Sequence, residues 1–256
     1  MSELPVKVWL EHGGRLLRLR LAKPKANIVD ATMIAALSSA FSAHHHEADL
    51  TAVVLDAQGS HFSFGASVEE HLPEQCAQML TSFHALIKQM LDYPVPILVA
   101  IQGQCLGGGL ELACSGDILF AQPHAKLGQP EIKLGVFAPA ASCLLPEKMS
   151  SGNAQDLLWS GRSVDAVEAH RMGLVNELAE QPSVAAVAWF EQHLLSSSAS
   201  SLRFAVKAAQ HDAVTRIKAK LDAVEALYLQ ELMHTHDAVE GLQAFIEKRK
   251  VNWGQR

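Results

Sequence analysis

The sequence of 256 residues predicts an α/β fold that is followed by a helical end. Over the first two thirds of the chain, short β-branched runs alternate with segments whose apolar residues recur every three or four positions. That alternation is typical of βα units. The last third contains helical patterns only, and it begins at the serine-rich residues 196–201. We therefore expect an α/β core over residues 1–195 and a helical C-terminal region over residues 196–256.

Composition and charge exclude several classes of protein. Hydrophobic residues make up 49% of the chain and charged residues 19%, which is typical of a globular protein. The formal net charge of -6, without a stripe of Lys and Arg, argues against a nucleic-acid partner. No apolar run approaches the roughly 20 residues of a membrane helix, and no signal peptide is evident. The four cysteines lack C-x-x-C pairing, so we expect reduced thiols in a cytoplasmic protein.

The N-terminal segments predict a hairpin and a capped helix. Residues 6–11 and 15–21 alternate partly in polarity around the turn at residues 12–14, as the strands of a β-hairpin do. Asp30 is a suitable N-cap for a helix that reaches about residue 43, because apolar side chains follow it at helical spacing.

Buried strands and one long helix are expected in the middle of the core. The continuous apolar runs that predict strands lie at residues 51–56, 97–101 and 118–121. Residues 72–91 have apolar side chains near three-four spacing and stop before two prolines, so we expect a helix there. Residues 136–142 are apolar, and we expect little regular structure in them.

Helical patterns dominate the rest of the chain. They lie at residues 153–159, 165–171, 183–195, 202–214 and 217–233. A last helix is expected to begin at Asp237, which forms a pattern like a capping box with Glu240. Its apolar face needs another element to cover it, and consists of Val239, Leu242, Phe245 and Ile246.

Three adjacent histidines, His44, His45 and His46, raise the question of a metal site. Adjacent side chains in a helix or strand point in different directions, so three in a row rarely converge on one ion. We interpret this run as the solvated end of a helix and expect no metal.

The segment over residues 96–131 carries the predicted site. A strand leads into three glycines at 107–109, a helix with Glu111 follows, and a second strand leads to Glu131. Burying an acid in an apolar segment costs several kcal/mol unless the acid is paired or functional. Two carboxylates in different environments can divide the roles of acid and base. The alternative is that each carboxylate caps a helix or forms an ion pair.

The glycines at 107–109 leave backbone N–H groups free at a helix N-terminus. Such groups suit a phosphate or an oxyanion, but neither nucleotide motif, G-x-x-x-x-G-K-[ST] or the dinucleotide G-x-G-x-x-G, is present. We therefore predict an oxyanion hole with a second N–H from Ala66, in the loop of small residues 61–67. A packing role for the glycines and a connecting role for the loop stay open.

A rival interpretation uses the same segment. Residues 103–107 match G-x-[SC]-x-G after a strand, the nucleophile elbow of α/β-hydrolases, with Cys105 as nucleophile. Asp165 and His211 would complete a triad. The helical last third, however, lacks a strand to present the histidine.

The central residues resemble the signature of the crotonase (enoyl-CoA hydratase/isomerase) superfamily. The resemblance covers AIQGQCLGGGLELA at residues 100–113, LGQPEI at residues 127–132 and the loop at residues 64–66. It extends to residues 237–250 and Trp253, so it spans nearly the whole chain. The fold that it implies is a ββα spiral core with a helical C-terminal region that packs in trimers or hexamers.

The resemblance also implies roles for single residues. Glu111 and Glu131 match the two catalytic glutamates of the hydratases. Ala66 and Gly108 match the pair whose N–H groups bind the thioester oxygen. Many family members keep one of the glutamates or neither, so the presence of both favours addition or removal of water. The residues that match the coenzyme A site are Lys25, Ala26, Asn27, Phe64 and Gly65.

Two departures from the family concern the acyl pocket. The family usually has an aspartate where this chain has Ser67, and residues 135–142 replace a glycine-rich stretch. Both fall where the acyl group should lie, which speaks against a straight-chain substrate. With residues 23–30 and 63–71, they look most like the cyclohexa-1,5-diene-1-carbonyl-CoA hydratases of anaerobic benzoyl-CoA degradation. The expected acyl-pocket residues are Ser67, Val136, Phe137 and Ala138.

The resemblance thus implies a hydratase without a cofactor, because coenzyme A is part of the acyl-CoA substrate. We expect a homotrimer or homohexamer. A straight-chain enoyl-CoA hydratase, an isomerase or a ring-opening hydrolase of the same family stays open, as does a non-catalytic acyl-CoA-binding protein. The sequence leaves open which glutamate is the acid and which end of a diene takes the hydroxyl.

Overall fold

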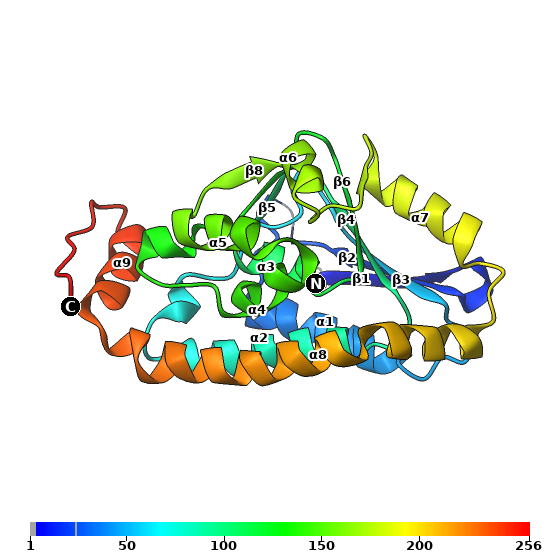
Figure 1. Cartoon of the computed structure of the whole chain (residues 1–256), viewed down its shortest axis with the longest axis horizontal. Coiled ribbons are helices and arrows are strands. Elements are labelled where there is room, and N and C mark those ends of the chain that lie inside the picture. Colours follow the sequence, from blue (N-terminus) through cyan, green and yellow to red (C-terminus); the bar gives the residue numbers. More distant parts are fainter. Residues whose placement is uncertain (1–3, 24) are drawn as a thin grey trace.

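The structure is a computed structural model that describes residues 4–23 and 25–256 (Figure 1). It contains a six-stranded and a three-stranded sheet. The first sheet contains, in spatial order, β1 (Val6–Glu11), β2 (Leu16–Leu21), β3 (Ala52–Ala57), β4 (Ile97–Ile101), β6 (Ile118–Ala121) and β9 (Glu177–Leu178). The second contains β5 (Gln104–Leu106), β7 (Lys126–Gly128) and β8 (Ser163–Asp165).

The predicted hairpin and the predicted buried strands are confirmed. Strands β1 and β2 pair antiparallel, with Val8 opposite Leu19, and the turn between them contains the short 3-10 helix η1 (His12–Gly14). From β2 onward the neighbours in the large sheet are parallel, and Leu19 lies opposite Leu55. Parallel pairing needs crossover connections, which the intervening helices supply.

Helices cover both faces of the large sheet: α1 (Ala31–His44) packs on one face and α7 (Pro182–His193) on the other. The further helices are α2 (Cys76–Leu91), α3 (Gly108–Cys114), α4 (Pro139–Lys148), α5 (Ser151–Ser160), α6 (Ala166–Arg171), α8 (Ala199–Gln230) and α9 (His236–Ile246). Further 3-10 turns are η2 (Glu69–His71), η3 (Pro130–Leu134) and η4 (Leu232–His234). Alternate residues of a strand face opposite sides, so Leu17 and Leu19 join the main core, whereas Leu16 packs under α7.

Helix α1 begins where the sequence predicts. The carboxylate of Asp30 accepts a hydrogen bond from the backbone N–H of Met33 at 2.9 Å, which satisfies one free donor of the first turn. Met33 and Leu37 are fully buried in the main core. The cap and the apolar face therefore act together.

The C-terminal region differs from the prediction in two ways. Residues 202–214 and 217–233 were expected to form two helices, but α8 is one continuous helix that packs against α2 and α4 (Figure 1). No Gly or Pro interrupts it, so tertiary contacts carry the helix through the weak apolar pattern. The cap of α9 is Thr235 and not Asp237, whose carboxylate instead accepts from the N–H groups of Gly254 and Gln255.

The expectation of little structure after residue 135 is also wrong. Helix α4 starts at Pro139, because proline fits the first helical position, where its missing N–H would have no intrahelical partner. The buried side chains of α4 join the main core. This helix start becomes part of the site described below.

The helical C-terminal region shares the core of the rest of the chain. Ile217, Leu221 and Tyr228 of α8 and Leu242 of α9 are buried in the same cluster as the sheet residues. The division at residue 195 stays a prediction. Within the described residues, every helix is too short or too polar to cross a lipid bilayer.

Candidate active site

A cavity of about 440 Å³ lies where the second sheet meets α2, η3 and α9. Its wall comes from segments that are far apart in the sequence. The lining residues are Phe64, Gly65, Ala66, Val68, His71, Leu80, Phe83, Leu106, Gly107, Gly108, Glu111, Pro130, Glu131, Lys133, Leu134, Val136, Phe137, Ala138, Pro139, Leu242 and Phe245. Both predicted glutamates and both predicted oxyanion-hole residues are among them.

The turn at Gly107 brings the start of α3 close to Glu131. Gly107 has a φ of 51°, in the region that side chains other than glycine rarely adopt. A Cβ atom at this position would lie 2.5 Å from Oε1 of Glu131, so a side chain would collide with the carboxylate. The N–H of Gly107 donates to the carbonyl of Gly128 at 2.9 Å, which ties the turn to β7.

The backbones of Ala66 and Gly108 lie side by side at the cavity wall. A Cβ atom built on Gly108 would lie 3.0 Å from the nitrogen of Ala66, and one on Gly65 would lie 3.7 Å from the nitrogen of Gly108. In the part of the chain that the structure describes, neither the Ala66 nor the Gly108 N–H donates to a protein acceptor. The N–H of Val29 donates to Gly65 and fixes the loop. Two free donors therefore face one small volume.

Glu111 is almost fully buried and is held by the start of α4. Its Oε1 accepts a hydrogen bond from the N–H of Ala141 at 2.8 Å. Burial raises the pKa of Glu111 to about 7, against the N–H groups of Ala141 and Ala140, which lower it. Both donors come from α4 and not from α3, the helix that carries Glu111.

Glu131 has an even stronger tendency to keep its proton. Burial raises the pKa of Glu131 well above its usual value, and the negative charge of Glu111 raises it further. With the nitrogen of its side-chain amide facing Glu131, Gln129 donates to both carboxylate oxygens of Glu131, at 3.2 and 3.0 Å. Among the ion pairs of the described residues, none involves Glu111 or Glu131.

The pair is therefore built for proton transfer rather than for pairing with a cation. Ionising one carboxyl group disfavours ionising the other, so Glu131 keeps its proton over the pH range in which Glu111 loses its own. One group is then ready to accept a proton and the other to donate one. Two backbone donors beside them can stabilise negative charge on a carbonyl oxygen.

The residues predicted for ligand binding divide into two groups. Phe64, Gly65, Val136, Phe137 and Ala138 line the cavity, while Lys25, Ala26, Asn27 and Ser67 do not. The carbonyl of Ala26 accepts from the N–H of Phe64, and the amide of Asn27 donates to the carbonyls of Gln58 and His61. This loop thus braces Phe64, and its predicted contact with coenzyme A stays a prediction.

Sequence reasoning missed several residues of the wall. Leu80 and Phe83 of α2 and Leu242 and Phe245 of α9 close the cavity, and His71 lies beside them at the end of η2. The apolar faces of both helices were recognised, but an apolar pattern does not say which element it covers. No sequence pattern identifies His71, because its orientation depends on a hydrogen bond with the Ser67 carbonyl that exists only in the folded protein.

The cysteine-hydrolase interpretation does not fit the geometry. Cys105 is fully buried, and burial raises its pKa well above the usual value, so the thiol is not poised as a nucleophile. Asp165 caps α6 through the N–H of Glu168, and His211 lines a different cavity beside α8. Within residues 4–23 and 25–256, no group of three or more His, Cys, Asp or Glu side chains is placed to hold a metal ion.

Comparisons with known proteins agree with this geometry. A model of the family described as Enoyl-CoA hydratase/isomerase matches residues 11–256. The chain is 66% identical over 258 residues to a cyclohexa-1,5-dienecarbonyl-CoA hydratase of Thauera aromatica, covering 100% of both chains. It is 32% identical to a probable enoyl-CoA hydratase of Mycobacterium tuberculosis, over 97% of this chain and 98% of that protein. A crystal structure of an enoyl-CoA hydratase/isomerase from Pseudoalteromonas atlantica is similar with a TM-score of 0.86 and 26% identity, over 98% and 100% of the two chains.

Proposed function

Because this chain belongs to the enoyl-CoA hydratase/isomerase family, we propose that it adds water to a conjugated double bond of a cyclic dienoyl-CoA thioester. The observation that carries the proposal is one apolar cavity in which two carboxyl groups without a cation partner and two backbone N–H groups without an acceptor, as far as residues 4–23 and 25–256 show, lie together. Addition of water to a double bond conjugated with a thioester uses an acid, a base and donors for the carbonyl oxygen. The preferred substrate would be cyclohexa-1,5-diene-1-carbonyl-CoA, which the relative from Thauera aromatica takes by its name.

The thioester oxygen would bind between the N–H groups of Ala66 and Gly108. When water attacks the conjugated double bond, electron density moves onto this oxygen and forms an enolate. Donors that are already in place stabilise that charge without reorganisation, and one such donor is typically worth about 100-fold in rate or more. The α3 N-terminus adds a favourable partial positive charge.

The two carboxyl groups would move one proton each. Glu111, with the lower pKa, accepts a proton from water as the new C–O bond forms. Protonated Glu131 gives its proton to the enolate carbon, so the product gains the atoms of one water. Return of the proton from Glu111 to Glu131 after product release restores the starting state. The reverse sequence describes dehydration.

The aromatic wall of the cavity supports a ring rather than a long chain. Phe137 and Val136 line the cavity, and Phe137 is held edge-on against buried Tyr228 at 5.2 Å between ring centroids. A rigid aromatic wall suits a flat six-membered diene. No cofactor is proposed, because coenzyme A arrives with the substrate.

We propose a trimer or a dimer of trimers as the working assembly. Phe204 of α8 and Trp159 of α5 are 75% and 70% exposed, and large apolar side chains of this kind are enriched in subunit interfaces. The cytoplasmic location predicted from the reduced cysteines stays a prediction.

The direct test is product analysis by mass spectrometry with cyclohexa-1,5-diene-1-carbonyl-CoA and crotonyl-CoA side by side. We expect a mass gain of one water on the cyclic substrate, with kcat/KM at least tenfold above that for crotonyl-CoA. A reversed preference would assign the chain to straight-chain hydration. A change of double-bond position without a mass gain would make it an isomerase.

A further inference from the structure

His71 has a fixed tautomer at the cavity wall. Its Nδ1 lies 2.7 Å from the carbonyl oxygen of Ser67, which can only accept a hydrogen bond. Nδ1 therefore carries the proton. In the neutral imidazole, Nε2 is then an acceptor with a free lone pair.

The imidazole is neutral at neutral pH. Burial lowers the pKa of His71 and outweighs the Ser67 carbonyl, which raises it. Glu69 and Glu70 point elsewhere: the Glu69 carboxylate accepts from the hydroxyl of Ser67, and the Glu70 carboxylate accepts from the N–H of Ala31. The tautomer given by geometry is thus the one that a ligand meets.

The position of the ring is set by the short helix η2. The N–H of His71 donates to the carbonyl of Val68 at 3.1 Å, and the hydroxyl of Ser67 accepts from the N–H of Glu70. The contact of Glu70 with Ala31 ties η2 to the start of α1. A ring held at both its backbone and its Nδ1 has one orientation, which is what a specificity contact needs.

Nε2 of His71 has no protein partner within the described residues. The cavity that His71 lines is otherwise largely apolar and includes Leu80, Phe83, Phe137 and Leu242. The other ionisable side chains of its wall are Glu111, Glu131 and Lys133. An acyl group that fills this apolar cavity removes water from Nε2. That loss is costly unless the ligand itself supplies a donor.

We propose that His71 is a specificity-determining residue that accepts a hydrogen bond from the hydroxyl group of the hydrated acyl ring. The dienoyl ring has no donor, whereas the hydrated ring has one. The contact therefore stabilises the hydrated ring relative to the diene inside the same cavity. This inference rests on the proposed hydratase function and names the chemical feature that the site selects: a ring that bears a hydroxyl.

The test measures KM in both directions for the wild-type protein, His71→Leu and His71→Gln. In His71→Leu, KM for the hydroxyacyl-CoA is expected to rise about tenfold, while KM for the dienoyl-CoA stays within twofold. His71→Gln keeps an acceptor near the position of Nε2 and should retain most of the wild-type preference. Cyclohexanecarbonyl-CoA, which has neither double bond nor hydroxyl, is the control: its inhibition constant should be the same in all three proteins.

Three outcomes overturn the proposal. In the first, KM for the hydroxyacyl-CoA is unchanged in His71→Leu. In the second, both KM values and the inhibition constant of the control rise together, as a packing role would require. In the third, His71→Gln behaves as His71→Leu. If the wild-type protein turns over neither thioester, the hydratase proposal fails instead. The role of His71 is then read from the dissociation constants of cyclohexanecarbonyl-CoA and its 2-hydroxy derivative, whose ratio His71→Leu should change about tenfold if the contact exists.

Discussion

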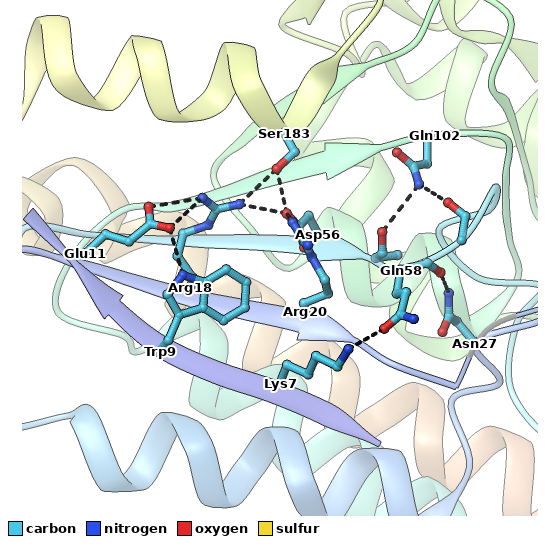
Figure 2. A network of polar contacts seen from close by, with 12 residues as sticks. Lys7, Trp9, Glu11, Arg18, Arg20, Asn27, Asp56, Gln58, Gln102 and Ser183 are labelled. Atoms are coloured by element: carbon cyan, nitrogen blue, oxygen red, sulfur yellow. Dashed lines mark hydrogen bonds and ion pairs between the residues drawn. The ribbon is translucent and has the colours of Figure 1, made fainter. Parts of the chain in front are cut away.

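Two regions of this molecule bury carboxyl groups in opposite ways. On the α7 side of the large sheet, Asp56 accepts hydrogen bonds from Arg20 at 2.6 and 2.7 Å, from Arg18 at 2.8 Å and from Ser183 at 2.6 Å (Figure 2). In the cavity, Glu111 is similarly buried, but its donors are backbone N–H groups at the start of α4, with that of Ala141 at 2.8 Å. Taken by itself, burial would raise the pKa of both carboxyl groups, because it disfavours the charged form.

The difference lies in what opposes the burial. Hydrogen bonds from Arg20 and Ser183 and the charges of both arginines bring the pKa of Asp56 below its usual value. Among the residues that the structure describes, no cation does this for Glu111 or Glu131, whose pKa values are raised. A paired buried acid holds structure and keeps one charge state. Glu111, with a pKa of about 7, instead changes its charge near neutral pH, which is the property that proton transfer requires.

The largest expected effect is on turnover in the cavity. Glu111→Gln and Glu131→Gln should each lower kcat by about 10²–10⁴-fold, because each removes a group that transfers a proton. Circular dichroism should show the wild-type fold in both variants. A variant that hydrates the preferred thioester at near wild-type rate would exclude the two-glutamate mechanism.

Asp56→Ala should act on stability and not on chemistry. It removes the carboxylate that accepts from Arg18, Arg20 and Ser183 and leaves Arg18 with Glu11 as its remaining acidic partner, so we expect a loss of about 1.5–3 kcal/mol of unfolding free energy. Urea denaturation measures this loss, and kcat per folded molecule should not change. Asp156→Ala is the matched control, because the pair of Asp156 with Arg162 is about 40% exposed and is worth at most about 1 kcal/mol. Equal losses in the two variants would remove the distinction between the regions.

The next largest effect is expected when a single methyl group is added at Gly108, which should lower kcat. A Cβ there would lie 2.9 Å from Cβ of Ala66, so Gly108→Ala pushes the two backbone donors apart. We expect kcat to fall about 100-fold. Gly152→Ala, in α5, is the control, because a Cβ there meets nothing within 4 Å. If Gly108→Ala keeps wild-type kcat, the donors do not hold the reacting oxygen.

The two regions should also respond oppositely to pH. Glu111 ionises near 4.5 in the unfolded chain and near 7 in the folded one, so stability falls as pH rises through this window. Glu111→Gln should therefore gain on the order of 2 kcal/mol relative to wild type between pH 5 and pH 8. The stabilisation from Asp56 is instead fully present above its unfolded pKa of 3.8 and is lost as pH falls through its lower folded value.

Urea denaturation at several pH values checks these signs, and initial rates provide a second check. Ionised Glu111 is needed for hydration, so kcat/KM should rise with pH through about 7, the pKa of Glu111 in the free protein. A wild-type stability that grows from pH 5 to pH 8 relative to Glu111→Gln would show that a cation or a water network compensates the buried charge.

The sequence was most informative where local chemistry decides the structure. The hairpin around residues 12–14, the cap at Asp30 and the glycine turn at residues 107–109 follow from residue types at fixed spacing. The two glutamates could be identified because an acid is out of place in an apolar segment. The sequence did not predict the hydrogen-bond partner of each acid. The contact of Ala141 with Glu111, for example, depends on where α4 lies in space.

Helices were harder to place than strands in this chain. The long α8 was split at residues 215 and 216 because its apolar pattern weakens there, while packing against α2 and α4 keeps it continuous. His71 and Phe245 line the cavity because the fold brings η2 and α9 to the same place, which the sequence pattern of neither segment predicts. Contacts between distant segments carry this information, and periodicity along one segment does not.

The cavity wall has a consequence for folding kinetics. Its segments, from Phe64 near the start of the core to Phe245 in α9, are brought together by contacts of very large sequence separation. Closing such long loops costs chain entropy before any of the contacts is gained, so structures of this kind form late. Helix content should return early when the denatured protein is diluted out of urea. Hydratase activity should return last, which makes turnover a reporter of the final docking of α9.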